Sequence, residues 1–138
     1  MEALAAYSHA LAALIAFALI VLALSPFSAL AKQNRGLAPG ATPAEDYSDR
    51  SYRLNRAYLN GCETLPAFLT VTVAAMLAGA APFWVNLLAS LVLVTRIAML
   101  AVHLTGAGKP HTGLRTVFYV AGWACMIVLA LLALLAVF

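Results

Sequence analysis

Four polar residues at regular spacing stand out in a strongly apolar chain. Arg53, Arg56, Asn60 and Glu63 follow one another at intervals of three, four and three residues. On an α-helix, which turns by about 100° per residue, these four side chains lie within about 80° of one another. They therefore share one helix face. Charged and amide groups next to apolar spans need partners or water, so we expect this face to border a partly hydrated pocket.

Two later segments carry polar residues at helical spacing as well. Arg96 and His103 are seven residues apart, and Arg115 and Tyr119 are four apart, with Thr116 beside Arg115. Ionisable residues inside membrane spans are costly and mark functional sites by default. We predict that three helices bring these polar faces together around one shared pocket.

Two structural explanations stay open. Arginine and lysine side chains near helix ends commonly extend to lipid head groups, which accounts for Arg50, Arg53 and Lys109. Glu63 and Arg96 could instead form an ion pair that joins two helices. A single ion pair leaves the other polar residues unexplained, so we favour the pocket.

The elements that position these residues are four apolar spans. Of 138 residues, 64% are hydrophobic and only 9% are charged, whereas about 25% are charged in a typical soluble domain. In lipid, every backbone polar group must be bonded internally, so the spans are predicted to be helices. The predicted fold is all-α, a single integral membrane four-helix bundle over residues 1–138. Its spans cover residues 9–31, 60–81, 83–105 and 116–138, and a polar loop covers residues 32–50.

Local residues also indicate helix ends and orientation. Ser48 or Asp49 is suited to cap the second helix, and Pro82 is suited to the first turn of the third. Basic residues gather between the first two spans and between the last two. Positive charge favours the cytoplasmic side, so both termini are predicted to lie outside the cytoplasm and the pocket to face it.

The stretch from Arg53 to Pro66, RLNRAYLNGCETLP, resembles the signature of the MAPEG family, the membrane-associated proteins in eicosanoid and glutathione metabolism. That signature reads approximately Arg-x-x-Arg-Ala-x-x-Asn-x-x-Glu, followed by an apolar segment with proline. The likeness extends over essentially the whole chain and suggests a divergent, bacterial member in the inner membrane. The resemblance implies a homotrimer with glutathione sites between neighbouring subunits.

The function that the resemblance implies is a membrane-bound glutathione transferase or peroxidase, with glutathione as thiol cosubstrate and no metal. A lipophilic electrophile or lipid hydroperoxide would be the second substrate. The protein is expected to contact membrane lipid and not to bind nucleic acid. In some members a hydroxyl residue directly after the fourth-helix arginine assists the thiolate, so Arg115 and Thr116 are the catalytic candidates. The binding candidates are Arg53, Arg56, Asn60, Glu63, Arg96, His103, Arg115 and Tyr119.

Three departures from the family pattern leave other functions open. Leu59 stands where glutathione-binding members have an arginine, Met99 where they have a histidine, and His103 where they have a tyrosine. Each lost contact to a charged or buried partner costs about 1–3 kcal/mol. Whether the chain is an enzyme therefore stays open. The alternatives are a non-catalytic member that binds a lipid or another anionic ligand, and a structural membrane protein whose polar residues only join helices.

Overall fold

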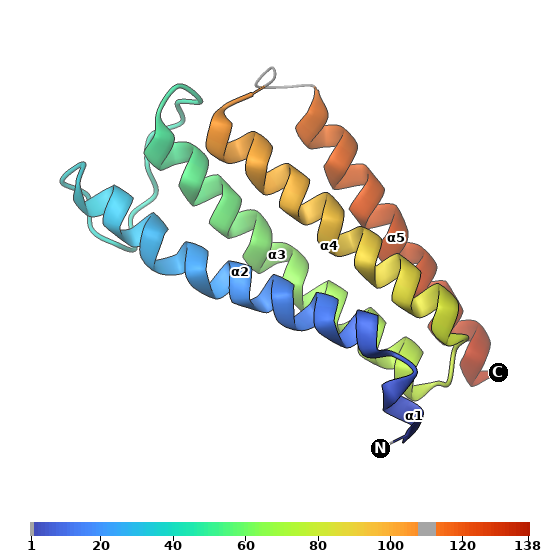
Figure 1. Cartoon of the computed structure of the whole chain (residues 1–138). Helices are drawn as coiled ribbons and strands as arrows, with labels where there is room; N and C mark the ends of the chain where they lie inside the picture. Colours follow the sequence, from blue (N-terminus) through green and yellow to red (C-terminus); the bar gives the residue numbers. More distant parts are fainter. Residues whose placement is uncertain (1, 108–112) are drawn as a thin grey trace.

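Four long helices run side by side in the computed structural model, which describes residues 2–107 and 113–138 (Figure 1). The long helices are α2 (Ser8–Gln33), α3 (Arg50–Leu77), α4 (Pro82–Thr105) and α5 (Leu114–Val137), and a short helix α1 (Glu2–Ala5) precedes them. The described residues include no strand. The predicted all-α, four-helix architecture is confirmed, although α1 was not expected.

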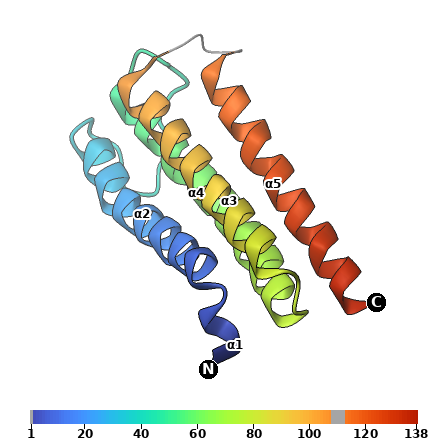
Figure 2. The same cartoon turned by 45° about the vertical axis from the view of Figure 1, so that its right-hand side comes forward.

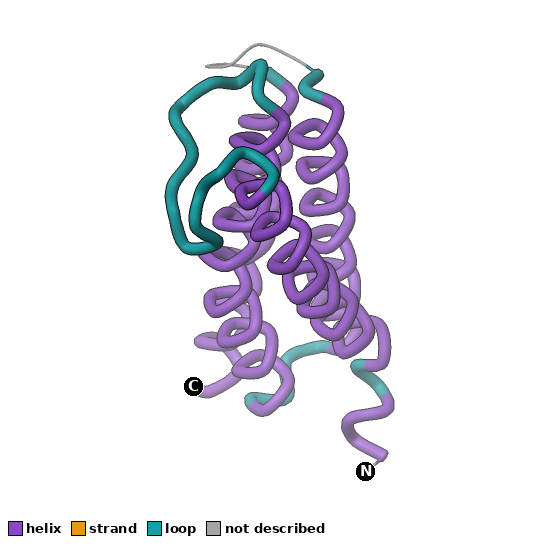
Figure 3. The backbone as a smooth tube through the Cα atoms, turned by 90° about the vertical axis from the view of Figure 1, so that its left-hand side faces the viewer, coloured by secondary structure: helices purple, strands orange, loops and turns teal. Residues whose placement is uncertain are grey.

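The two ends of the bundle differ. Both chain termini lie at one end, and the long connection between α2 and α3 lies at the other (Figures 1 and 3). We call this second end, where residues 34–49 and 106–107 lie, the loop end. Helix α2 packs against α3 and α4, and α5 packs against the same two helices. Helices α3 and α4 therefore lie between α2 and α5 (Figure 2).

Apolar side chains fill the bundle and also cover its outside. The rings of Phe17 and Phe68 meet edge-on with centroids 6.1 Å apart, and Leu129 is fully buried. At the same time Leu22 and Leu135 are 68% and 77% exposed. Large exposed apolar surfaces are unfavourable in water but suit a helix that contacts lipid.

Helices α2, α4 and α5 are each long and apolar enough to cross a membrane. With 24 residues, α4 and α5 are about 36 Å long, which exceeds the hydrocarbon core of about 30 Å. Helix α3, with 28 residues, is longer than these two, but its half at the loop end carries the polar motif. It runs over Arg50–Leu77, whereas the apolar span expected from the sequence covered residues 60–81. The polar approach to that span is thus helical too.

The predicted helix ends are confirmed at two places. The carboxylate of Asp49 accepts a hydrogen bond from the N–H of Ser51 at 3.0 Å and caps α3. Pro82 lies in the first turn of α4, where its missing N–H costs no helical hydrogen bond. Between these helices, Gly79 has φ +75°, a conformation that glycine adopts without strain.

Side chains hold the connection between α2 and α3 in place. Arg35 and Asp49 form an ion pair at 2.8 Å. The hydroxyl and the N–H of Ser48 donate to Asp46, and these hydrogen bonds lower the pKa of the Asp46 carboxyl below its usual value. Lys32, which is buried, donates to the carbonyl of Pro39 at 3.0 Å. The loop end therefore has a defined shape.

At the opposite end, polar contacts join the start of α2 to the first turns of α4 and to the connection between α3 and α4. The hydroxyl of Tyr7 donates to the carbonyl of Ala80 at 2.6 Å. The Asn86 side chain donates to the carbonyl of Ala6 at 2.7 Å and accepts from the N–H of Ala10 at 3.0 Å. The two Asn86 contacts satisfy backbone groups that the break between α1 and α2 leaves without a helical partner.

Replacing Tyr7→Phe should lower the free energy of unfolding by about 1–3 kcal/mol, because the buried Ala80 carbonyl loses its donor. The matched control is Tyr58→Phe, whose hydroxyl has no hydrogen-bond partner among residues 2–107 and 113–138. Thermal unfolding in detergent measures both variants. An equal loss of stability in the two would contradict the assigned role of Tyr7.

Candidate functional site

A pocket of about 360 Å³ lies at the loop end between α3, α4 and α5. Seven of the predicted site residues line it, from three helices. Two lining residues, Tyr47 and Met99, were not among the predicted site residues. The lining residues are Tyr47, Arg56, Asn60, Glu63, Met99, His103, Arg115, Thr116 and Tyr119.

The helical repeat explains how α3 and α5 present these groups. Arg56, Asn60 and Glu63 are four and three residues apart, so they project from one face of α3. Arg115 and Thr116 lie in the first turn of α5, which begins at Leu114. The positive end of the helix dipole at this first turn adds to the charge of Arg115.

Tyr47, from the loop before α3, organises one wall of the pocket. The guanidinium carbon of Arg115 lies 4.0 Å from the centroid of the Tyr47 ring, a cation–π contact. On α4, His103 stacks near the same ring with centroids 6.4 Å apart. Periodicity could not reveal Tyr47, because it belongs to no helix.

Arg53 shares the α3 motif but does not line the pocket. Its Nε donates to the carbonyl of His103 at 3.1 Å, and its Nη1 donates to the carbonyls of Tyr47 and Ser48, both at 2.8 Å. The guanidinium is thus used to fix the loop to α4. The structure assigns Arg53 a positioning role for Tyr47 rather than a direct place in the pocket.

Arg96 lies behind the pocket, with only 4% of its surface exposed. Its Nη1 donates to Asn60 Oδ1 at 3.3 Å, and its Nη2 donates to the carbonyl of Tyr119 at 3.1 Å. It therefore joins α4 to α3 and α5. The ion pair between Arg96 and Glu63 that the sequence left open does not form; Glu63 is instead exposed in the pocket.

Two buried nitrogen atoms near this arginine have no hydrogen-bond partner in the described part of the chain. They are Nε of Arg96 and Nδ1 of His103. Both side chains also line a small cavity of about 20 Å³ beside Asn60 and Met99. Buried polar atoms normally have hydrogen-bond partners, so these two nitrogen atoms are suited to bind a polar ligand or a bridging water.

The balance of charge in the pocket is positive. Arg56 and Arg115 line it together with one carboxylate, that of Glu63, and the cationic Arg96 lies next to it. No ion pair involving Glu63 occurs among the described residues. The arrangement suits a ligand that carries more than one negative group and one positive group.

Gly122 on α5 has no side chain and so leaves space for the guanidinium group of Arg96. A Cβ atom at Gly122 would lie 2.6 Å from both Arg96 Nη2 and Thr95 Oγ1. Gly122→Ala should therefore displace Arg96 and lower the free energy of unfolding by about 1–3 kcal/mol, as overpacking typically does. The control is Gly40→Ala, because a Cβ there meets no atom within 4 Å. Unchanged thermal stability of Gly122→Ala would show that Arg96 is not held tightly against α5.

Comparison with known proteins agrees with this architecture. The family model for the MAPEG family matches residues 8–135, which include all the pocket residues. No curated protein matches the chain. The matched range covers nearly the whole of the four-helix bundle and confirms the resemblance found in the α3 motif. The protein therefore belongs to the MAPEG family and is an integral membrane protein.

Proposed function

We propose that this protein is a membrane-bound transferase or peroxidase that uses glutathione as its thiol substrate. The observation that carries the proposal is the convergence of Arg56 and Glu63 on α3 with Arg115 and Thr116 on α5 around one pocket. Membership of the MAPEG family supports glutathione as the thiol. The second substrate would be a lipophilic electrophile or a lipid hydroperoxide.

The groups in the pocket match those of glutathione, which carries two carboxylates, one ammonium group and a thiol. Arg56 and Arg115 offer forked donors for carboxylates, and Glu63 offers an acceptor for the ammonium group. The volume of about 360 Å³ falls within the range of about 300–1,000 Å³ typical of small-molecule sites. His103 also lines the pocket, and its Nδ1 is buried without a partner in the described residues.

The same charges would favour the reactive form of the thiol. A thiolate, not a thiol, is the nucleophile, and nearby cations lower the pKa of the thiol. Arg115 and the first turn of α5 supply this positive field, and the hydroxyl of Thr116 could donate to the sulfur.

In transfer to an electrophile, the sulfur would bond to the electrophilic carbon, the leaving group would depart with its electron pair, and the thiol proton would pass to solvent. In peroxide reduction, two thiols would be oxidised to a disulfide while the hydroperoxide is reduced to an alcohol and water.

The surroundings of the pocket suit two substrates of opposite polarity. Apolar side chains on the outside of α5, such as Val117 and Val120, are 60% and 50% exposed close to the pocket. A lipophilic substrate could therefore arrive from the bilayer, while glutathione would arrive from the aqueous side at the loop end. We place the loop end in the cytoplasm on the distribution of basic residues, and the family resemblance implies a homotrimer that closes each pocket with a neighbouring subunit.

The two alternatives account for fewer of the observations. Arg96 does join three helices, as a purely structural role requires. That role does not explain why Glu63 and Thr116 remain exposed around the pocket. Of the departures from the family pattern, Met99 lines the pocket and Leu59 does not. A non-catalytic binding protein remains the second candidate, and turnover distinguishes it from an enzyme.

Arg115→Ala should weaken glutathione binding about 10- to 100-fold, the equivalent of about 1.5–3 kcal/mol for a hydrogen bond to a charged group. Arg115→Lys should retain part of the affinity, since it keeps the charge but loses the fork. Calorimetry in detergent measures the affinity for glutathione of the wild type and of both variants. Glutathione binding of equal strength in the wild type and Arg115→Ala would show that glutathione does not bind at Arg115 and would contradict the proposed site.

Glu63→Gln should lower glutathione-dependent turnover of an apolar electrophile, chiefly through a higher KM for glutathione, because the ammonium group loses its anionic partner. The matched control is Glu45→Gln, an exposed loop carboxylate outside the pocket. Steady-state kinetics in detergent or lipid measures both variants. Saturable glutathione binding with no turnover in the wild type would favour the non-catalytic alternative.

A further inference from the structure

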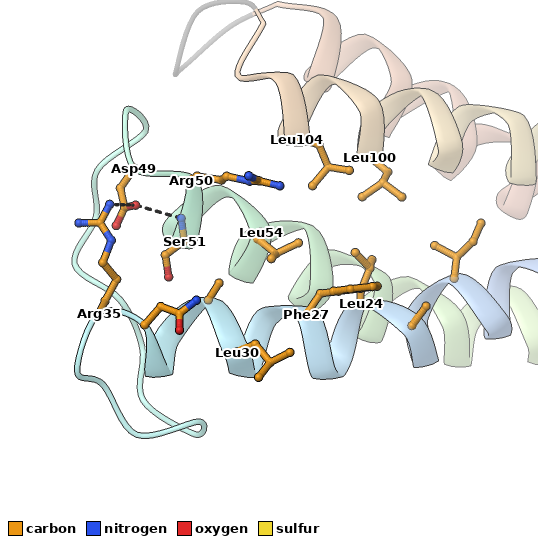
Figure 4. A pocket seen from close by; sticks show the side chains of 14 residues that line it. Leu24, Phe27, Leu30, Arg35, Asp49, Arg50, Ser51, Leu54, Leu100 and Leu104 are labelled. Atoms are coloured by element: carbon orange, nitrogen blue, oxygen red, sulfur yellow. Dashed lines mark hydrogen bonds and ion pairs between the residues drawn. The ribbon is translucent and has the colours of Figure 1, made fainter.

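A second and larger pocket lies at the loop end, on the side of the bundle where α2 faces α4 (Figure 4). Its volume is about 740 Å³, and it shares no lining residue with the candidate glutathione pocket. Its walls are mainly apolar and come from three helices. They include Phe27 and Leu30 on α2, Leu54 on α3, and Leu100 and Leu104 on α4.

This pocket is a groove that opens to the surroundings of the bundle. Phe27 and Leu30 are 61% and 54% exposed, and Leu104 is 40% exposed. Two of the three helices that form it, α2 and α4, are candidate membrane spans. In a membrane, the open side of such a groove contacts acyl chains rather than water.

The mouth of the groove carries an uncompensated positive charge. Arg50, the first residue of α3, reaches along the groove toward Leu104 (Figure 4). It forms no hydrogen bond or ion pair within the described residues. Arg35 also lines the mouth, but its charge is balanced by Asp49 at 2.8 Å. One cation therefore remains at the polar end of an apolar groove.

We propose that this groove binds an anionic phospholipid, with an acyl chain between α2 and α4 and the phosphate at Arg50. The apolar walls match the chain, and the single unbalanced guanidinium matches the charge of the head group. The mouth lies beside the loop between α2 and α3 (Figure 4), so a head group bound there would meet Arg50 while its acyl chain follows the apolar walls. The site is separate from the proposed thiol chemistry and does not depend on it.

The test is a lipid competition on the full chain, purified and delipidated in detergent. Native mass spectrometry would compare retention of phosphatidylglycerol with that of phosphatidylcholine of the same acyl chains. We expect phosphatidylglycerol to be preferred about five-fold, the effect of one basic residue at an anionic membrane surface. In Arg50→Gln the two lipids should bind equally.

A second pair of variants tests the apolar part of the groove. Leu104→Trp fills it and should reduce the retention of both lipids. The matched control is Leu91→Trp on the same helix, since Leu91 is 41% exposed and Leu104 is 40% exposed. Leu91 lines none of the three pockets described above, so this control should retain both lipids as the wild type does.

Three results would overturn the proposal. The first is an unchanged lipid preference in Arg50→Gln. The second is an equal effect of the two tryptophan variants. The third is a Leu104→Trp protein that keeps both lipids but changes its oligomeric state, which would make the groove a contact between copies of the chain.

Discussion

A guanidinium group buried inside an apolar helix bundle is the constraint on which the loop end of this protein depends. Arg96 has no carboxylate partner in the described chain. Neutral groups stabilise its charge instead: the Asn60 amide oxygen, the carbonyl of Tyr119 and the face of the Tyr119 ring. Burying an ion without such partners costs several kcal/mol. The three helices must therefore approach at this depth, and Gly122 supplies the space.

The position of Arg96 also determines what the neighbouring groups can do. Because Arg96 does not pair with Glu63, the Glu63 carboxylate stays available in the pocket. Because Arg96 donates a hydrogen bond to the side-chain oxygen of Asn60, the Asn60 amide is held in a fixed orientation. A second arginine, Arg53, has a comparable role for the loop, since it donates to the carbonyls of Tyr47 and Ser48. Arg53 thus positions Tyr47, whose ring contacts Arg115, while Arg96 holds Asn60 in the wall of the pocket.

Polarity in this protein is divided along the bundle axis. The charged residues of α3 and the ends of α4 and α5 gather at the loop end, whereas the other end is held by neutral contacts of Tyr7 and Asn86. This division is what lipid permits, since charged groups are tolerated near the interface and neutral hydrogen bonds near an apolar end. The candidate glutathione pocket and the groove between α2 and α4, which both have charged residues in their lining, lie at the loop end for the same reason.

The fold and most of the candidate site were predictable because their causes are local. Composition and span length gave the four helices, and the 3.6-residue repeat placed Arg56, Asn60 and Glu63 on one face. The same repeat did not predict the position of the Arg53 guanidinium, because a long side chain bonds wherever acceptors lie within reach. Tyr47 was missed because a loop has no periodicity. The partners of Arg96 were not predictable, since they depend on how α3, α4 and α5 pack.

The central claim is that the arginine-lined pocket holds the thiol of glutathione as a thiolate, and the most direct measurement is the pKa of that thiol on the protein. A pH titration of thiolate ultraviolet absorbance, with glutathione and saturating wild-type protein in detergent, gives this pKa. The account predicts a value clearly below that of a free thiol, about 8.5. A bound glutathione whose thiol titrates at or above the free value would contradict it.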